Sequence, residues 1–180
     1  LEKEGHEIIK LNIGDPLAYP NFPTPKHMID AYIDALKNQK NGYSPSYGIE
    51  SLRVAISNFE KNQKNGGWNC NPSDVYITSG VSEALLILFA SFLFPNDKIL
   101  TPGPFYPPYV SYPPIFKSSV IQYRLMEEDN WKIDFDDIKK KLDNNVKLLC
   151  VINPNNPTGS VLEKDEILKL IEIVDEYPNC

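Results

Sequence analysis

The chain alternates strand-like and helix-like segments over its last hundred or so residues, and this order limits the folds that it can adopt. Short apolar runs rich in β-branched residues predict strands at 74–78, 98–101, 120–123 and 146–152. Apolar residues at helical spacing predict helices at 83–94, 135–142 and 164–176. Strand, turn and helix in succession predict an α/β fold with a parallel sheet and helices on both faces.

The N-terminal part has a different organisation. A short strand is expected at 8–13, followed by the glycine turn at Gly14 and a proline-rich loop over 17–25. Apolar residues at helical spacing then predict two helices, at 26–38 and at about 49–64.

Composition excludes several classes of protein. The 180 residues suit one domain, or one domain plus a piece of another, and 42% hydrophobic residues can supply a core. A net charge of −6 with only two arginines argues against a nucleic-acid binder. The longest uncharged, mainly apolar run covers 84–94, too short for a bilayer that takes about 20 residues. The three cysteines are scattered, so we expect neither a disulfide framework nor a zinc site. Because the sequence also shows no signal-peptide pattern, we expect a soluble protein of a reducing compartment.

Three unusual turns follow predicted strands, at 78–83, 101–109 and 153–159. Ligands of parallel α/β sheets bind outside the carboxyl ends of the strands, so the three turns are expected at one edge of one sheet. Together they indicate a binding site more strongly than any one of them does.

The first turn contains Gly80 between a predicted strand and a predicted helix. A glycine there exposes the first N–H groups of the helix, which favour an anion such as phosphate, and the Ser82 hydroxyl can add a donor. The alternative is an ordinary left-handed turn with a serine N-cap. No Gly-Lys-Ser/Thr follows, so the turn is not a Walker loop.

The second turn is stiffened by proline: six of the sixteen prolines lie between Pro102 and Pro114. A stiff loop can hold Tyr106 or Phe105 flat against a ligand ring. The alternative is a proline-ordered surface loop whose aromatic side chains belong to the core.

The third turn has two Asn-Pro steps, whose peptide bonds can be cis, and Asn156 offers both a donor and an acceptor. The alternative is a plain turn, since Asn, Pro and Gly are common turn residues. Two weaker candidates lie earlier in the chain, where Gly14 allows close backbone approach to a ligand and Tyr43 offers a phenolic donor.

Five segments in this order resemble the fold type I pyridoxal-phosphate-dependent aminotransferases, and most closely their alanine aminotransferase-like branch. They are LNIGDP at 11–16, YSPSYGIESLR at 43–53, ITSGVSEA at 77–84, PGPFYPPY at 102–109 and INPNNPTG at 152–159. The resemblance covers essentially the whole chain. It implies the three-layer large domain of aspartate aminotransferase with a mainly parallel sheet, here incomplete at the C-terminus. Residues 41–180 would form part of that domain, and 1–40 would contribute to the small domain and the substrate loop.

The resemblance also implies roles for single residues. Gly80, Val81 and Ser82 match the positions that bind the phosphate of pyridoxal 5′-phosphate, and Tyr106 matches the aromatic residue that stacks on its ring. Asn156 matches the asparagine that bonds the ring O3′ near the substrate carboxylate, and Gly14 the loop glycine that closes over the substrate. Tyr43 matches the tyrosine that reaches the cofactor phosphate of a neighbouring subunit, which implies a homodimer with shared active sites.

The implied function is transfer of an amino group from an amino acid such as alanine to a 2-oxo acid such as 2-oxoglutarate, in the cytoplasm. In the family the Schiff-base lysine comes well after the NPTG segment, so no catalytic residue is assigned within these 180 residues, which alone should be inactive. Two alternatives remain. One is another enzyme of the same fold, such as a lyase, synthase or decarboxylase. The other is a cofactor-sensing regulatory module fused to a DNA-binding domain, which no helix-turn-helix pattern in the ten residues before LNIGDP supports.

Overall fold

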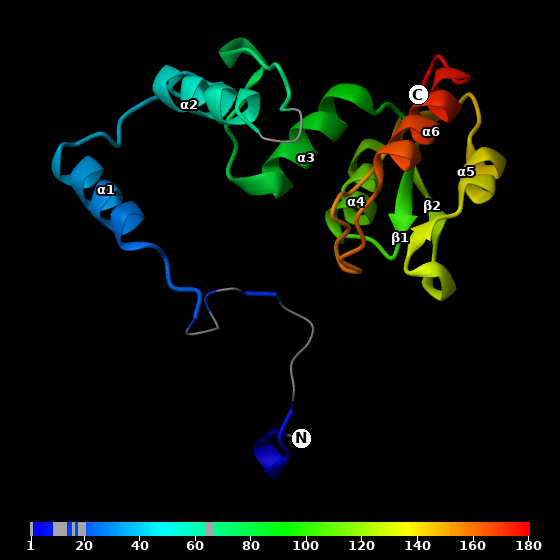
Figure 1. The fold of residues 1–180 in the computed structure, drawn as a ribbon, viewed down its shortest axis with the longest axis horizontal. Coiled ribbons are helices and arrows are strands. Elements are labelled where there is room, and N and C mark those ends of the chain that lie inside the picture. Colours follow the sequence, from blue (N-terminus) through cyan, green and yellow to red (C-terminus); the bar gives the residue numbers. More distant parts are fainter. Residues whose placement is uncertain (1, 9–13, 16, 18–20, 64–66) are drawn as a thin grey trace.

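The computed structural model describes residues 2–8, 14–15, 17, 21–63 and 67–180, and its C-terminal half contains a mixed sheet, which lies on the right in Figure 1. Its strand order is β3-β2-β1-β4. β1 (Lys98–Gly103) pairs in parallel with both β2 (Ser119–Met126) and β4 (Val146–Leu149). The two-residue β3 (Lys132–Ile133) pairs antiparallel with β2 and was not expected. The predicted α/β fold with a mainly parallel sheet is confirmed.

The strand predicted at 74–78 is wrong. Residues Pro72–Asp74 form the short 3₁₀ helix η3, and residues 75–78 follow it without joining the sheet. The Ile77 N–H donates to the Tyr47 carbonyl at 3.2 Å, outside any strand ladder. An alternating apolar pattern favours an extended backbone, but a strand also requires a paired neighbour. Of the other early strand, predicted at 8–13, residues 9–13 lie outside the described residues.

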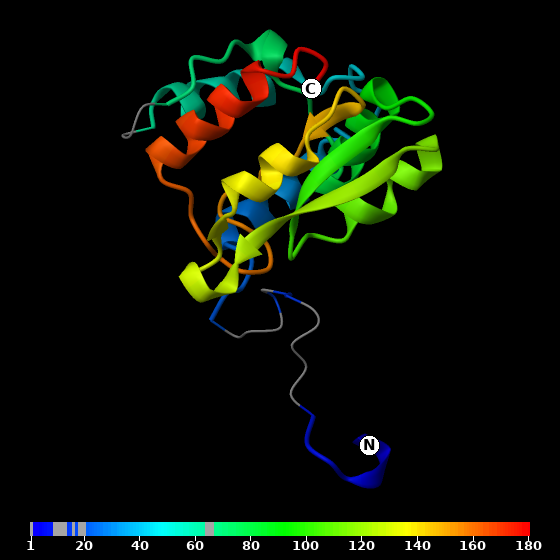
Figure 2. The ribbon, with the colours of Figure 1, turned by 90° about the vertical axis from the view of Figure 1, so that its right-hand side faces the viewer.

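Helices cover both faces of the sheet, as predicted (Figure 2). On one face, α5 (Phe135–Lys141) and α6 (Lys164–Asp175) pack their buried side chains into a core with Leu100 of β1. On the other, α3 (Gly80–Phe92) packs Leu85 and Phe89 against Ile99. Successive residues of a strand point to opposite faces, so Ile99 and Leu100 serve different cores. The result is a three-layer arrangement.

The helix ends follow local chemistry. Asp134 precedes α5 and accepts a hydrogen bond from the Asp137 N–H at 3.0 Å, as an N-cap residue does. α3 begins at Gly80, three residues before the predicted start at 83. The prolines of the second turn produce two further short helices, α4 (Pro108–Ser111) and the 3₁₀ helix η4 (Pro113–Phe116). Two more 3₁₀ turns are η1 (Glu2–Glu4) and η5 (Glu127–Asp129).

The two N-terminal helices, α1 (Lys26–Lys37) and α2 (Glu50–Lys61), match their predicted ranges to within three residues. α1 lies apart from the sheet in Figure 1. Its apolar stripe, which includes Tyr32 at 70% exposure, has no buried residue within the part of the chain that the structure describes. None of the described helices is long and apolar enough to cross a membrane.

Candidate functional site

The loops that follow β1 and β4 leave the sheet at the same edge, because the two strands are parallel neighbours. Leu100 pairs with Leu149, and the Cys150 N–H donates to the Leu100 carbonyl at 2.7 Å. The Tyr123 hydroxyl on β2 donates to the Cys150 carbonyl at 2.9 Å, which ties the end of β4 to a third strand. The second and third turns of the sequence are thus brought together, as expected for loops at the carboxyl ends of strands.

The first turn of α3 presents backbone donors. Gly80 has φ +78°, a left-handed conformation that glycine adopts without strain, and an added Cβ would meet nothing within 4 Å. The N–H groups of the first turn have no intrahelical acceptor, by the geometry of an α-helix. The Glu83 carboxylate accepts from the Ser79 N–H, just before the helix. The N–H groups of Gly80 to Ser82 are therefore the donors that this turn can offer to an anion.

A side-chain contact joins this helix to the proline-rich loop. The Ser82 Oγ and the Tyr106 hydroxyl lie 3.3 Å apart, and either atom can donate. Both residues are half-buried. The hydrogen bond places an aromatic ring beside the N-terminus of α3, although the two residues are 24 positions apart in sequence.

Tyr106 also packs against the protein core, as the alternative interpretation of the second turn expects, while ring stacking on a ligand stays a prediction. It packs against the core formed by α3 and Ile99, together with Tyr109. The Tyr109 N–H donates to the Tyr106 carbonyl at 3.1 Å, and the Gly103–Pro104 peptide bond before them is cis. Phe105 is half-buried, and the structure gives it no ring contact within the described residues.

The third turn is held by Asn155, a residue that the sequence analysis did not single out. Asn155 is 7% exposed, and its Nδ2 donates to the Thr158 Oγ1 at 2.8 Å. Its backbone N–H donates to the Ser160 carbonyl, and its carbonyl accepts from the Gly159 N–H, both at 2.8 Å. Asn156 is exposed beside this closed turn, so its amide is accessible to a ligand. Both Asn-Pro peptide bonds of the turn are cis.

Two candidates are not brought to this edge by the described chain. Tyr43 lies in the segment between α1 and α2, and its side chain is fully exposed. Gly14 is exposed. A role for either residue at the site requires contacts that are not present among the residues that the structure describes.

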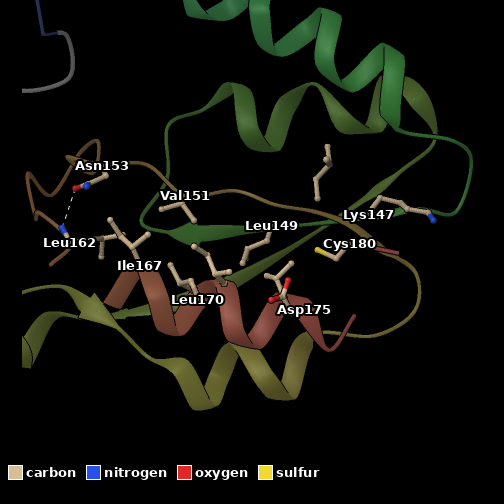
Figure 3. A pocket seen from close by; sticks show the side chains of 12 residues that line it. Lys147, Leu149, Val151, Asn153, Leu162, Ile167, Leu170, Asp175 and Cys180 are labelled. Atoms are coloured by element: carbon tan, nitrogen blue, oxygen red, sulfur yellow. Dashed lines mark hydrogen bonds between the residues drawn. The ribbon is translucent and has the colours of Figure 1, made fainter. Parts of the chain in front are cut away.

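An apolar pocket lies elsewhere, between β4 and α6 (Figure 3). Its volume is about 430 Å³, and Leu149, Val151, Ile167 and Leu170 are among its lining residues. Apart from Asn153 at one end, it includes none of the residues of the three turns. We place the candidate site at the polar edge with Ser82, Tyr106 and Asn156, because the lining of the pocket is mainly aliphatic and the three turns of the sequence lie outside it, apart from Asn153.

Two half-buried groups near the ends of β1 and β4 have raised pKa values. Burial, and then the nearby Cys180, raise the pKa of the Cys150 thiol to about 12. Burial, followed by Cys150 and Tyr106, also raises the pKa of the Tyr109 phenol. Both groups are uncharged at neutral pH and add no negative charge to this part of the sheet.

We expect Cys150 to resist alkylation in the folded protein at pH 8. The thiolate is the reactive form, and an ordinary cysteine has a pKa near 8.5, so the raised pKa lowers the thiolate fraction by about 100-fold or more. The test is iodoacetamide labelling read by peptide mass spectrometry, with the protein unfolded in guanidinium as the control. Labelling of Cys150 at the same rate in both conditions would contradict the burial seen here.

Comparison with known proteins identifies similar sequences and structures over nearly the whole chain. The family model for aminotransferase class I and II matches residues 6–180. Glutamate-pyruvate aminotransferase AlaA of Haemophilus influenzae is 36% identical over 96% of this chain, which spans 42% of that protein. The S-alkyl-thiohydroximate lyase SUR1 of Arabidopsis thaliana is 34% identical over 92% of this chain and 36% of its own length.

Among solved structures, alanine aminotransferase from Pyrococcus furiosus superposes with a TM-score of 0.91 at 42% identity. The match covers 98% of this chain and 44% of that one. The chain therefore spans less than half the length of the relatives that it matches.

Proposed function

We propose, given that this chain belongs to the class I and II aminotransferase family, that the whole protein is a pyridoxal-phosphate-dependent aminotransferase. The amino donor is an amino acid, with alanine expected, and the acceptor is a 2-oxo acid such as 2-oxoglutarate. The names of the relatives in Haemophilus and Pyrococcus favour alanine and pyruvate as one substrate pair. The single observation that carries the proposal is the contact between Ser82 and Tyr106, which joins an anion site to an aromatic ring.

The residues at this edge fit pyridoxal phosphate. The cofactor has a phosphate and a flat aromatic ring, and the structure offers helix N–H groups and the Ser82 hydroxyl beside the Tyr106 ring. The open space at Gly80 lets a phosphate approach the backbone. When bound, the cofactor supplies the electron sink that stabilises a carbanion at the substrate, and the protein holds and orients it.

Each residue then has a defined task. The N–H groups of Gly80, Val81 and Ser82 bind the phosphate, and Tyr106 stacks on the ring. Asn156, exposed next to the turn that Asn155 closes, donates a hydrogen bond to the ring O3′ and lies near the substrate carboxylate. The proton transfers at the substrate belong to a lysine outside this chain, and no lysine among residues 1–180 is assigned that task.

The proposal includes a second subunit. Tyr43 is fully exposed, as expected of a side chain that reaches the cofactor phosphate of a partner in a homodimer with shared sites. Gly14 lies in the segment that we assign to substrate closure. Residues 1–40 then contribute to the small domain, whereas 41–180 form part of the large cofactor-binding domain of a cytoplasmic enzyme.

The direct test is an assay of the whole protein with added pyridoxal phosphate. We expect pyruvate to form from alanine when 2-oxoglutarate is present, and glutamate to form in equal amount. Aspartate replaces alanine in a parallel reaction, which measures donor preference. Absence of amino transfer from alanine, aspartate and glutamate alike would reject the aminotransferase assignment.

A lyase is the second candidate, because one similar protein, in Arabidopsis, is named as one. A lyase cleaves a bond of its substrate and needs no amino acceptor. Product formation that continues when the 2-oxo acid is left out would therefore favour a lyase, whereas strict dependence on the 2-oxo acid favours the aminotransferase.

A further inference from the structure

We propose that Tyr109 is a positioning residue that fixes the plane of the Tyr106 ring relative to helix α3. The proposal rests on the proposed role of Tyr106 as the residue that stacks on the cofactor. Tyr109 has no assigned part in that role, and it acts here only through Tyr106.

The Tyr109 ring lies between two other rings. Its centroid is 6.2 Å from that of Tyr106 with an interplanar angle of 70°, and 6.5 Å from that of Phe89 with an angle of 68°. Both are edge-to-face contacts, which are favourable because the positive edge of one ring meets the negative face of another. Phe89 is 1% exposed and provides an anchor that is packed into the core.

Helix α3 consequently holds the tyrosine pair at two points. Ser82 in its first turn contacts the Tyr106 hydroxyl, and Phe89 two turns later contacts the Tyr109 ring. Seven residues of helix separate the two contacts, about 10 Å along the axis. The hydrogen bond from the Tyr109 N–H to the Tyr106 carbonyl completes the link.

Two contacts fix the orientation of the Tyr106 ring, which a single contact leaves free. The Ser82 hydrogen bond alone lets the Tyr106 ring rotate about the axis from Cγ to its hydroxyl oxygen. The contact with the Tyr109 ring restricts that rotation. The phosphate and the ring of the cofactor are joined covalently, so their two binding groups must keep a set separation and angle. Loss of the Tyr109 ring should therefore weaken cofactor binding without removing any group that touches the cofactor.

The experiment measures the affinity of the whole protein for pyridoxamine 5′-phosphate by calorimetry. This form of the cofactor has no aldehyde and cannot bond covalently to lysine, so its Kd reports the phosphate and ring contacts. We expect Tyr109→Leu to raise the Kd by about 2- to 10-fold, the range that corresponds to one aromatic pair. Tyr109→Phe keeps the ring and should restore most of the affinity.

Tyr112→Leu is the matched control. Tyr112 packs against the same core, and no ring contact of its own is present within the described residues. A general loosening of the core should lower the unfolding temperature in both leucine variants and raise the Kd in both. The proposal is overturned if the two variants raise the Kd equally, and supported if only Tyr109→Leu does.

A double-mutant cycle with Tyr106→Ala separates this proposal from the one on which it rests. If Tyr109 acts through Tyr106, Tyr109→Leu has no further effect on the Kd in the Tyr106→Ala background. Additive effects of the two substitutions would overturn the role of Tyr109 and leave that of Tyr106 intact. The same conclusion would follow if Tyr106→Ala raised the Kd but Tyr109→Leu did not. An unchanged Kd in Tyr106→Ala would instead refute the stacking role itself.

Discussion

A protein consisting of residues 1–180 alone is expected to show no measurable amino transfer from alanine to 2-oxoglutarate. The phosphate and ring contacts that we propose lie in this stretch, but the lysine that forms the Schiff base in the family does not. A positioned acid–base group contributes about 10²- to 10⁴-fold to a rate, and the loss here includes the covalent attachment as well. Pyruvate formation with excess pyridoxal phosphate, measured beside the whole protein, checks this expectation.

Binding must be measured in the same sample, because a chain that fails to hold the cofactor is inactive for a different reason. α1 leaves an apolar stripe exposed, so circular dichroism should first establish that the 180-residue protein is folded. Turnover within tenfold of the whole protein would show that a lysine among residues 1–180 serves the reaction.

The second large effect is expected at the third turn, where two neighbouring asparagines have different environments. Asn156→Ala should weaken binding of pyridoxal phosphate by about 10- to 100-fold, the range for a hydrogen bond to a charged or strongly polar group. It should also shift the absorbance maximum of the bound cofactor, because the O3′ atom loses a partner. Its effect on the unfolding temperature should be small, since the side chain is exposed.

Asn155→Ala is the matched control for this substitution. Asn155 is buried and its side chain bonds Thr158, so its removal should lower the free energy of unfolding by about 1–3 kcal/mol. We therefore expect a spectral change without destabilisation in one variant and clear destabilisation in the other. An unchanged spectrum and rate in Asn156→Ala would argue against the O3′ bond.

Most of the strands and helices were accessible to prediction because their signals are local. β1, β2 and β4 begin within one residue of the apolar runs that predicted them, and α5 and α6 begin at their predicted residues. The prediction of a strand at 74–78 was wrong because strand formation is not a local property. It requires pairing with a neighbouring strand, which a pattern within five residues cannot reveal. β3 was missed because two residues carry no periodic signal.

The candidate site was predicted in part. The glycine turn before α3, the stiff proline loop and the Asn-Pro turn were identified from residue types that permit only a few backbone conformations. Asn155 and Tyr109 were not singled out, although Asn155 is next to Asn156 and Tyr109 is three residues after Tyr106. The roles of Asn155 and Tyr109 depend on burial and ring geometry, which cannot be inferred from the identities of the neighbouring residues in sequence.

The sequence by itself determined the order of elements, the positions of the three turns and the family to which the chain belongs. These depend on the backbone preferences of single residues and on apolar spacing within one element. Only the tertiary structure decided that Ser82 meets Tyr106, that Asn155 is buried while Asn156 is exposed, and that Tyr109 lies between Phe89 and Tyr106. The contacts between Ser82 and Tyr106 and between Phe89 and Tyr109 join residues 24 and 20 positions apart, and they form only when helix α3 packs against one face of the sheet.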